Sequence, residues 1–258
     1  SWELNDDATV WTIKLRAGTK YSDGTPFTTE WIKWYWDNVQ TYTDITSTPS
    51  ERWGWGSPRV AAELGVVDDF TFTLTYGEPK PLLAYELARN IPQDPGFYLE
   101  QFHPAFNEAA ALQTAAEAMG LSSPLDYWKN RESWRTNPEV PLLFPWTPET
   151  DLSVEMHVMN RNPYFWQVDE AGNQLPYIDK VQHRLFETID VFNMWAVNGE
   201  IDMQYRHVDV GNFTLFKEGE DAGDYKVAVG INASHDGVQL NLTTKNEPLR
   251  EFFNILDV

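Results

Sequence analysis

Two kinds of hydrophobic repeat alternate along this chain, and this alternation is the feature that most limits how it can fold. Residues 10–16 alternate apolar and polar side chains, which predicts a half-buried strand. A Ser-Asp-Gly-Thr-Pro turn follows. Apolar side chains then recur from Ile32 to Val39 with the 3.6-residue period of a helix, which Thr28 can cap. The chain therefore begins as strand, turn and helix.

Both repeats recur farther along, and Pro- and Gly-rich segments separate them. Period-two alternation predicts strands over residues 63–67, 70–75, 154–160, 180–187, 202–205, 225–230 and 237–242. Helical spacing or composition predicts helices over residues 82–87, 105–119, 125–134 and 189–197, with 208–217 helical or irregular and 41–59 a long loop. The strands follow neither a strict βαβ order nor a series of hairpins, so we expect a mixed α/β (α+β) fold.

Charge and aromatic content narrow the possible partners. The 258 residues carry a formal net charge of −20, which opposes binding to nucleic acid and to anionic membranes. The chain also holds 12 Trp, 11 Tyr and 14 Phe, more than a core of this size needs. The surplus suggests a surface that stacks on a ligand.

Metal and redox chemistry find little support in the sequence. There is no Cys, which excludes disulfides, thiolate metal sites and Cys nucleophiles. The five His are scattered without a helical His-x-x-x-His pair, and the acidic segment 218–224 lacks the spacing of a calcium loop. We therefore expect no metal and no cofactor.

A Pro-rich crossing at residues 138–148 marks a boundary between two parts, 1–145 and 146–258. No stretch approaches the roughly 20 apolar residues of a membrane-spanning helix. The chain begins at Ser1 without a Met and runs almost at once into a strand pattern. We expect the true N-terminus, with any export signal, to be missing.

Three ordered motifs resemble one known family, the family 5 extracellular solute-binding proteins of bacterial ABC transporters, of the oligopeptide-binding type. Residues 11–16 with 20–28 are similar to its strand–turn–helix signature. Residues 161–166, Arg-Asn-Pro-Tyr-Phe-Trp, are similar to its Arg-Asn-Pro-x-Tyr-Trp turn. Residues 198–202, Asn-Gly-Glu-Ile-Asp, are similar to a helix end in the family. The segment 240–253 resembles the crossing into the second lobe.

The resemblance implies a fold, a function and a location. The fold would be a periplasmic-binding-protein-like type II lobe, with an accessory subdomain at 1–145, a core at 146–258 that leads to the inter-lobe hinge, and the second lobe missing. The function would be capture of an oligopeptide between two lobes and delivery to an ABC permease, without catalysis. We expect a monomer in the periplasm or, as a lipoprotein, anchored outside the cell.

Departures from the family pattern leave a second ligand class open. Residues 143–146, Leu-Phe-Pro-Trp, replace a Gly-Thr-Gly-Pro-Tyr-like entry, and the loop 169–175 lengthens the segment after Trp166. Both resemble a Trp-rich branch that binds peptides or β-linked oligosaccharides. An oligosaccharide is therefore the alternative ligand.

The resemblance places pocket residues just after the Gly-Glu-Ile-Asp turn, at Tyr205, Arg206 and His207. Tyr205 could stack or hydrogen-bond and Arg206 could bind a carboxylate, or all three could be surface groups at a strand end. Trp53 and Trp55 in the long loop could stack on a sugar or a side chain, or could instead anchor the loop. The hypothesis requires Tyr205 and at least one of these Trp to be partly exposed on one concave face.

A glycan-active hydrolase or a lectin-like module is the alternative from another class. The acidic, Trp-rich composition suits a glycoside hydrolase, which needs two carboxylates facing each other across a cleft. The sequence contains no Gly-x-Ser-x-Gly, His-Glu-x-x-His or phosphate-loop motif. We therefore favour a binding protein over an enzyme.

Overall fold

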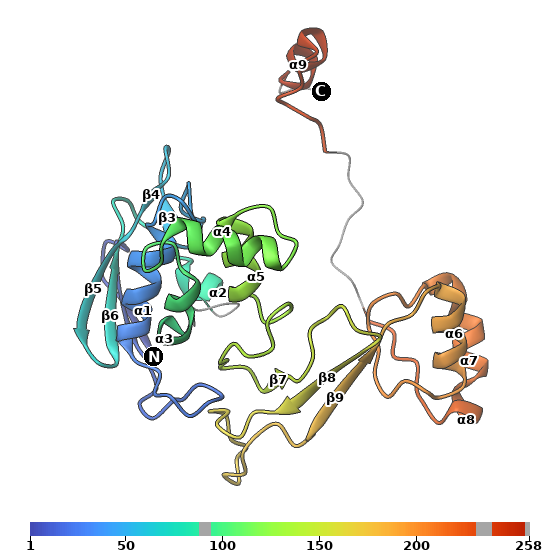
Figure 1. The fold of residues 1–258 in the computed structure, drawn as a ribbon. Helices are drawn as coiled ribbons and strands as arrows, with labels where there is room; N and C mark the ends of the chain where they lie inside the picture. The colour runs from blue at the N-terminus through green and yellow to red at the C-terminus, as the bar shows by residue number, and fades with distance from the viewer. Residues whose placement is uncertain (88–93, 231–238, 256–258) are drawn as a thin grey trace. The chain divides into compact units, whose positions relative to one another are not determined.

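The computed structural model describes residues 1–87, 94–230 and 239–255, which divide into two compact units (Figure 1). The first unit is Ser1–Leu185 and the second is Phe186–Val258. This division does not coincide with the boundary expected after residue 145, because the strands that follow that position pack with the first unit. The assignment of 1–145 as an accessory subdomain stays a prediction.

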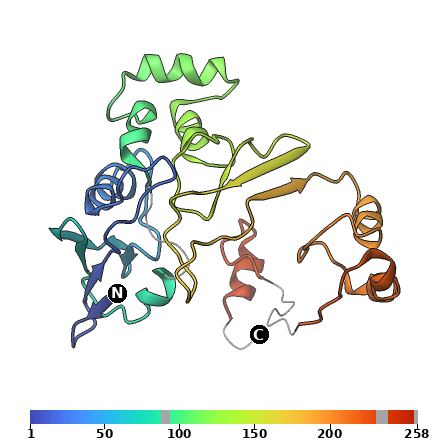
Figure 2. The same ribbon diagram turned by 90° about the horizontal axis from the view of Figure 1, so that it is seen from below.

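Strands, helices and short turns alternate in the first unit, as the two sequence repeats predict. Its strands are β1 (Trp2–Leu4), β2 (Val10–Lys14), β3 (Gly54–Trp55), β4 (Val60–Ala61), β5 (Glu63–Asp68), β6 (Thr71–Thr75), β7 (Trp146–Pro148), β8 (Met156–Arg161) and β9 (Lys180–Arg184). Its helical elements are α1 (Thr29–Tyr35), η1 (Trp36–Gln40), α2 (Leu83–Leu87), α3 (Gly96–Leu99), η2 (Glu100–Phe102), α4 (Ala109–Ala118) and α5 (Pro124–Glu132). The Ala-rich helix starts later than expected, at Ala109, and stands at the outer edge of this unit (Figure 2, green).

The main sheet of the first unit is antiparallel, with strand order β1-β2-β6-β5. In the β2–β6 pairing Trp11 lies opposite Leu74 and Ile13 opposite Phe72, so that four apolar side chains share one face. All four are buried. The alternation in the sequence is thus the alternation of the two faces of this sheet.

Helix α1 covers that face of the sheet. Ile32 is fully buried and belongs to the same core cluster as Trp36 and the inward-facing strand residues. Thr28 occupies the N-cap position as expected, but its side chain makes no capping hydrogen bond. The last turn winds as a π-helix, η1, whose buried Val39 completes the apolar stripe.

A second core cluster lies on the other side of α1. It contains Trp34 and Val39 together with Leu99, Phe102 and Trp128 from α3, η2 and α5. The backbone of α3 comes so close to Trp34 that a Cβ on Gly96 would lie 2.4 Å from the indole ring. Helix α1 therefore contributes side chains to two cores.

Two of the three family-like motifs meet in the first unit. The Arg16 guanidinium donates to the carbonyl oxygen of Trp166 at 2.9 Å, and its carbon lies 5.6 Å from the centre of that indole ring. The Lys20 ammonium lies 5.5 Å from the ring centre of Tyr164. The strand–turn–helix segment and the Arg-Asn-Pro turn are therefore neighbours in space, although about 140 residues of sequence separate them.

The second sheet of the first unit has the order β7-β8-β9, all antiparallel. Its register places His157 of β8 directly opposite His183 of β9. Strands were expected over 154–160 and 180–187, and both form with slightly different ends.

The regular elements that the structure describes in the second unit are all helical. Its elements are α6 (Ile189–Val197), η3 (Val210–Asn212), α7 (Phe213–Glu218), α8 (Glu220–Gly223) and α9 (Glu247–Phe253). The strands expected over 202–205 and 225–230 were wrong, since these described residues form no strand. A strand needs a neighbour that shares its backbone hydrogen bonds, and neither segment has one in the described part of this unit. Of the strand expected over 237–242, residues 237–238 lie outside the described residues and 239–242 form none.

Two buried carboxyl groups of the first unit have raised pKa values. Burial, followed by the charge of Asp94, raises the pKa of Glu132 to about 7. Burial also raises the pKa of Asp94 to about 6. Both groups therefore hold protons in the folded state at pH values where an unfolded chain has lost them.

The raised pKa values predict that this unit loses stability as the pH rises from about 4 to about 7. In this window the folded state binds more protons than the unfolded state, so each rise in pH favours unfolding. Glu132→Gln removes one titrating group. We expect its free energy of unfolding to exceed that of the unsubstituted protein at pH 7.5 by an amount on the order of 1 kcal/mol, and this difference to disappear near pH 4. Urea unfolding at both pH values measures it, with the exposed Glu63→Gln as control. A difference that is the same at both pH values would contradict the assignment.

The contact between α3 and Trp34 predicts opposite effects at two glycines. Gly96→Ala places a methyl group against the buried indole and should cost about 2 kcal/mol or more of stability. Gly77→Ala meets nothing within 4 Å and needs no left-handed backbone, so it should be neutral or slightly stabilising. Thermal melts of both variants compare them; equal melting temperatures would refute the packing of α3 on α1.

Candidate functional site

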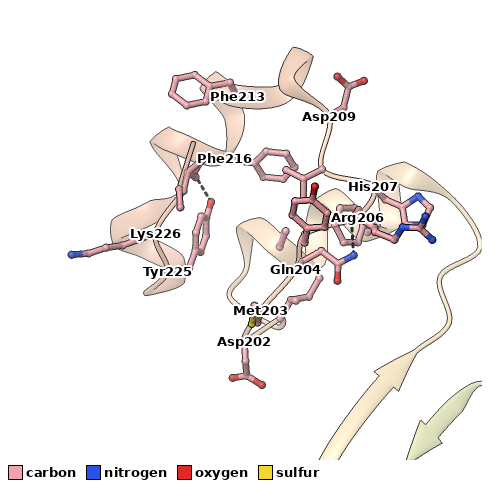
Figure 3. Close-up of a pocket in the computed structure, with 18 of the residues that line it drawn as sticks. Asp202, Met203, Gln204, Arg206, His207, Asp209, Phe213, Phe216, Tyr225 and Lys226 are labelled. Carbon is pink, nitrogen blue, oxygen red and sulfur yellow. Dashed lines mark hydrogen bonds between the residues drawn. The ribbon is translucent and has the colours of Figure 1, made fainter. Parts of the chain in front are cut away.

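The candidate site is an open pocket of about 1180 Å³ in the second unit (Figure 3). It is lined by residues of helices α6 and α7 and by two further segments, 201–210 and 223–230, which are mostly without regular structure. The residues that line it include all three of the expected pocket residues, Tyr205, Arg206 and His207. The structure therefore brings this part of the predicted site together in one hollow.

The turn after α6 directs the chain into the pocket. Thr188 caps the start of α6, because its side chain accepts a hydrogen bond from the backbone N–H of Val191. Helix α6 ends at Val197, and Gly199, two residues later, has a φ of +71°; a Cβ there would lie 2.2 Å from the carbonyl oxygen of Gly223. Only glycine fits this position, which gives a physical reason for the glycine of the Asn-Gly-Glu-Ile-Asp motif.

The opposite wall of the pocket is held by hydrogen bonds to the segment 225–230. The Tyr225 hydroxyl donates to the carbonyl oxygen of Phe216 at 2.6 Å. The backbone N–H of Val227 donates to the Glu220 carboxylate at 2.7 Å. These two bonds fasten a segment without regular structure to helices α7 and α8.

The three expected residues differ in how they are held. Tyr205 is 84% exposed, so its ring is free to contact a ligand. The Gln204 amide donates to the carbonyl oxygen of Arg206 at 2.6 Å and shapes the turn. His207 has a φ of +64°, a left-handed conformation that is uncommon for a residue other than glycine, and its ring lies edge-on to Phe186 with centres 5.4 Å apart. Such strain is often found at binding sites.

Charged groups of both signs line the pocket: Asp202, Asp209 and Asp224 together with Arg206 and Lys226. Figure 3 shows the side chains of Asp202 and Lys226 pointing away from the rest of the lining, with Arg206 and His207 next to each other. A guanidinium can bind a carboxylate through two parallel hydrogen bonds. An exposed tyrosine beside it adds an aromatic face and a hydroxyl group.

The two tryptophans of the long loop belong to the first unit, and they differ from each other. Trp53 is 3% exposed and packs edge-on against Trp36, with ring centres 5.8 Å apart. The expectation that Trp53 could stack on a ligand is therefore corrected: in this arrangement it anchors the loop, because the apolar core has enclosed it. Trp55 is 36% exposed, and the buried Lys80 ammonium lies 4.5 Å from the centre of its ring. Trp55 alone remains available for stacking.

The family is shown by a match over nearly the whole chain. Residues 1–254 match the model of the bacterial extracellular solute-binding proteins, family 5. The chain belongs to this family.

The relatives of this chain include one named for sugar binding and one named for peptide binding. The periplasmic alpha-galactoside-binding protein of Rhizobium meliloti is 29% identical over 191 residues, which cover 72% of this chain and 24% of that protein. The periplasmic oligopeptide-binding protein OppA of Salmonella typhimurium is 28% identical over 229 residues, which cover 84% of this chain and 36% of that protein. The chain thus spans about a quarter to a third of the length of these relatives.

Solved structures agree with the family assignment. An oligopeptide-binding protein OppA aligns with 99% of this chain and 41% of its own, at a TM-score of 0.81 and 32% identity. The periplasmic binding protein MelB of Agrobacterium fabrum, solved with stachyose, aligns with 85% of this chain at a TM-score of 0.64 and 25% identity. The fold is therefore the mixed α/β fold of the periplasmic binding proteins, as predicted.

Two features are absent from residues 1–87, 94–230 and 239–255, the part of the chain that the structure describes. No helix there has the length and apolar content needed to span a membrane. No group of three or more His, Cys, Asp and Glu side chains is arranged to hold a metal ion in those same ranges.

Sequence reasoning missed the residues that build the floor and far wall of the pocket. Phe192 was expected only as part of the apolar face of a helix, and it does lie buried there, but it also lines the pocket. No sequence pattern pointed to Phe216 or Tyr225, because the hydrogen bond that joins them forms only when α7 and the segment 225–230 fold together. The only usable hint was the motif that precedes the pocket.

The Tyr225 hydrogen bond predicts that this hydroxyl stabilises the pocket wall. Tyr225→Phe should cost about 1 kcal/mol and speed amide hydrogen exchange over residues 225–230. Tyr205→Phe is the matched control, because the exposed Tyr205 hydroxyl should leave exchange unchanged. Exchange followed by mass spectrometry distinguishes the two; equal exchange in both variants would contradict this role for Tyr225.

Proposed function

We propose that this chain is part of the extracytoplasmic solute-binding component of an ABC importer, which captures oligopeptides between two lobes and delivers them to a membrane permease. The observation that carries the proposal is the pocket containing Tyr205, Arg206 and His207 in a chain that aligns with an oligopeptide-binding protein over 99% of its length. Capture by closure of two lobes requires no bond to be made or broken, so the protein acts without catalysis. It works as a monomer in the periplasm or anchored outside the cell.

The chemistry of the pocket supports a peptide ligand. A peptide offers a terminal carboxylate for Arg206 and side chains or amide planes for Tyr205. Its remaining surface would contact the other lobe.

An oligosaccharide is the second candidate ligand, and one observation favours it. The relative from Rhizobium meliloti is an alpha-galactoside-binding protein, and MelB was solved with stachyose. The exposed ring of Trp55 could stack on a sugar. The sugar expected from the sequence was β-linked, whereas the named relative is an alpha-galactoside-binding protein, so α-linked sugars belong in any screen.

The two ligand classes make different demands on Arg206. If Arg206 binds the terminal carboxylate, Arg206→Met in the full-length receptor should weaken binding of a tri- to pentapeptide about 10- to 100-fold, the loss of one charge-assisted pair. The same peptide with an amidated C-terminus should bind more weakly to the unsubstituted receptor and be insensitive to Arg206→Met. Stachyose serves as the uncharged probe and Arg59→Met, in the first unit, as the control variant.

Isothermal titration calorimetry measures the affinity of each receptor variant for each ligand. The proposal is supported if the free peptides bind and if Arg206→Met weakens binding of the peptide with a free carboxylate but not of the amidated peptide. Tight binding of stachyose without binding of any peptide overturns the peptide assignment in favour of the sugar. Hydrolysis of peptide or glycan by the purified receptor contradicts a binding role without catalysis.

A further inference from the structure

Two histidines far apart in the sequence face each other across β8 and β9. The register pairs His157 with His183, and their rings are nearly parallel, with an interplanar angle of 22° and centres 6.0 Å apart. Both rings belong to the first unit. This pair lies outside the candidate ligand pocket.

The Nδ1 atom of His157 lies near two oxygen atoms, the Asp151 carbonyl oxygen and the Thr150 hydroxyl oxygen. It lies 3.3 Å from the carbonyl oxygen of Asp151. In the tautomer with the hydrogen on Nδ1, this nitrogen donates to the Asp151 carbonyl oxygen and Nε2 carries the lone pair. The Thr150 hydroxyl, 3.4 Å from Nδ1, could donate to Nδ1 only in the other tautomer, and the metal site uses the first. A backbone carbonyl that orients an imidazole in this way is the usual outer partner of a metal-binding histidine.

The free nitrogen of His157 is buried and lacks a partner. The residue is 2% exposed, and among the described residues no donor or acceptor bonds to its Nε2. Trp134 covers another side, with ring centres 6.3 Å apart. A buried acceptor without a partner costs free energy, so this nitrogen gains by binding a donor or a cation.

His183 supplies the second nitrogen. It is exposed, so its ring can turn about its side-chain bonds without disturbing the core. Two imidazole nitrogens on adjacent strands can share one ion at the 2.0–2.1 Å typical of zinc–nitrogen bonds, with water in the remaining positions. Imidazole ligands suit Zn²⁺, Ni²⁺ and Cu²⁺ rather than Ca²⁺ or Mg²⁺.

The charge around the pair favours a cation. The Asp151 side chain, whose residue contacts His157 through its backbone carbonyl, brings a carboxylate to this end of the sheet. The overall charge of −20 also attracts cations toward the surface.

The geometry points to a two-histidine binding site for a divalent transition-metal ion at His157 and His183. His157 Nε2 provides the fixed ligand and His183 the mobile one, and water completes the coordination. The site is separate from the solute pocket and does not depend on the proposed function.

Titration of Ni²⁺ and Zn²⁺ into the tag-free protein by calorimetry tests this site. We expect one ion bound per chain, thermal stabilisation by the ion, and at least a tenfold loss of affinity in His183→Gln. His207→Gln, which removes a histidine of the second unit, is the matched control and should bind the ions as the unsubstituted protein does. Because His183 is exposed, its replacement leaves the fold intact, which circular dichroism checks.

Cobalt provides a second readout that reports the ligands directly. Co²⁺ should give visible absorption bands in the unsubstituted protein and in His207→Gln, and the bands should be lost or altered in His183→Gln. Unchanged affinity and unchanged bands in His183→Gln would overturn the proposal, as would the absence of saturable binding below millimolar ion concentration.

Discussion

The antiparallel pairing of β2 with β6 is the constraint on which the first unit depends. It joins strands about sixty residues apart and places their apolar side chains on one face, where Ile32 of α1 seals them from water. Burial of apolar area on this scale is the dominant favourable term in folding. Helix α1 and the following η1 then contribute Trp34 and Val39 to the second cluster, so the position of α3, η2 and α5 follows from the position of α1. The indole N–H of Trp11 also donates to the carbonyl oxygen of Lys80, and this bond holds the segment after β6 against the sheet.

Charged groups in this unit are tolerated because each has a compensating environment. Lys80 is almost completely buried, and its ammonium lies 3.2 Å from the Glu86 carboxylate and over the ring of Trp55. A buried charge without such partners would cost several kcal/mol. The carboxyl groups of Asp94 and Glu132 avoid a full buried charge in another way, because their raised pKa values keep them partly protonated. Trp55 therefore has a structural task, as a cover for Lys80, as well as an exposed face.

The second unit is organised by close backbone contact and by polar bonds to irregular segments. The approach of Gly199 to Gly223 joins the end of α6 to α8, and the Tyr225 hydroxyl fastens the following segment. The pocket is consequently made of loops held on a helical support, a common arrangement for binding sites. The strained backbone of His207 lies in such a loop.

The sequence by itself determined the local elements and the family. Period-two and period-3.6 repeats are written in consecutive residues, so β2, β6, α1 and α6 could be predicted, and α6 was predicted with its exact bounds. The three motifs indicated the family, and one of them led to Tyr205, Arg206 and His207. The tertiary structure decided the properties that depend on distant partners. These are the burial of Trp53 and the failure of 202–205 and 225–230 to form strands. They also include the hydrogen bond between Tyr225 and Phe216 and the pairing of His157 with His183. Burial, strand pairing and side-chain register are set by contacts between segments that no local pattern specifies.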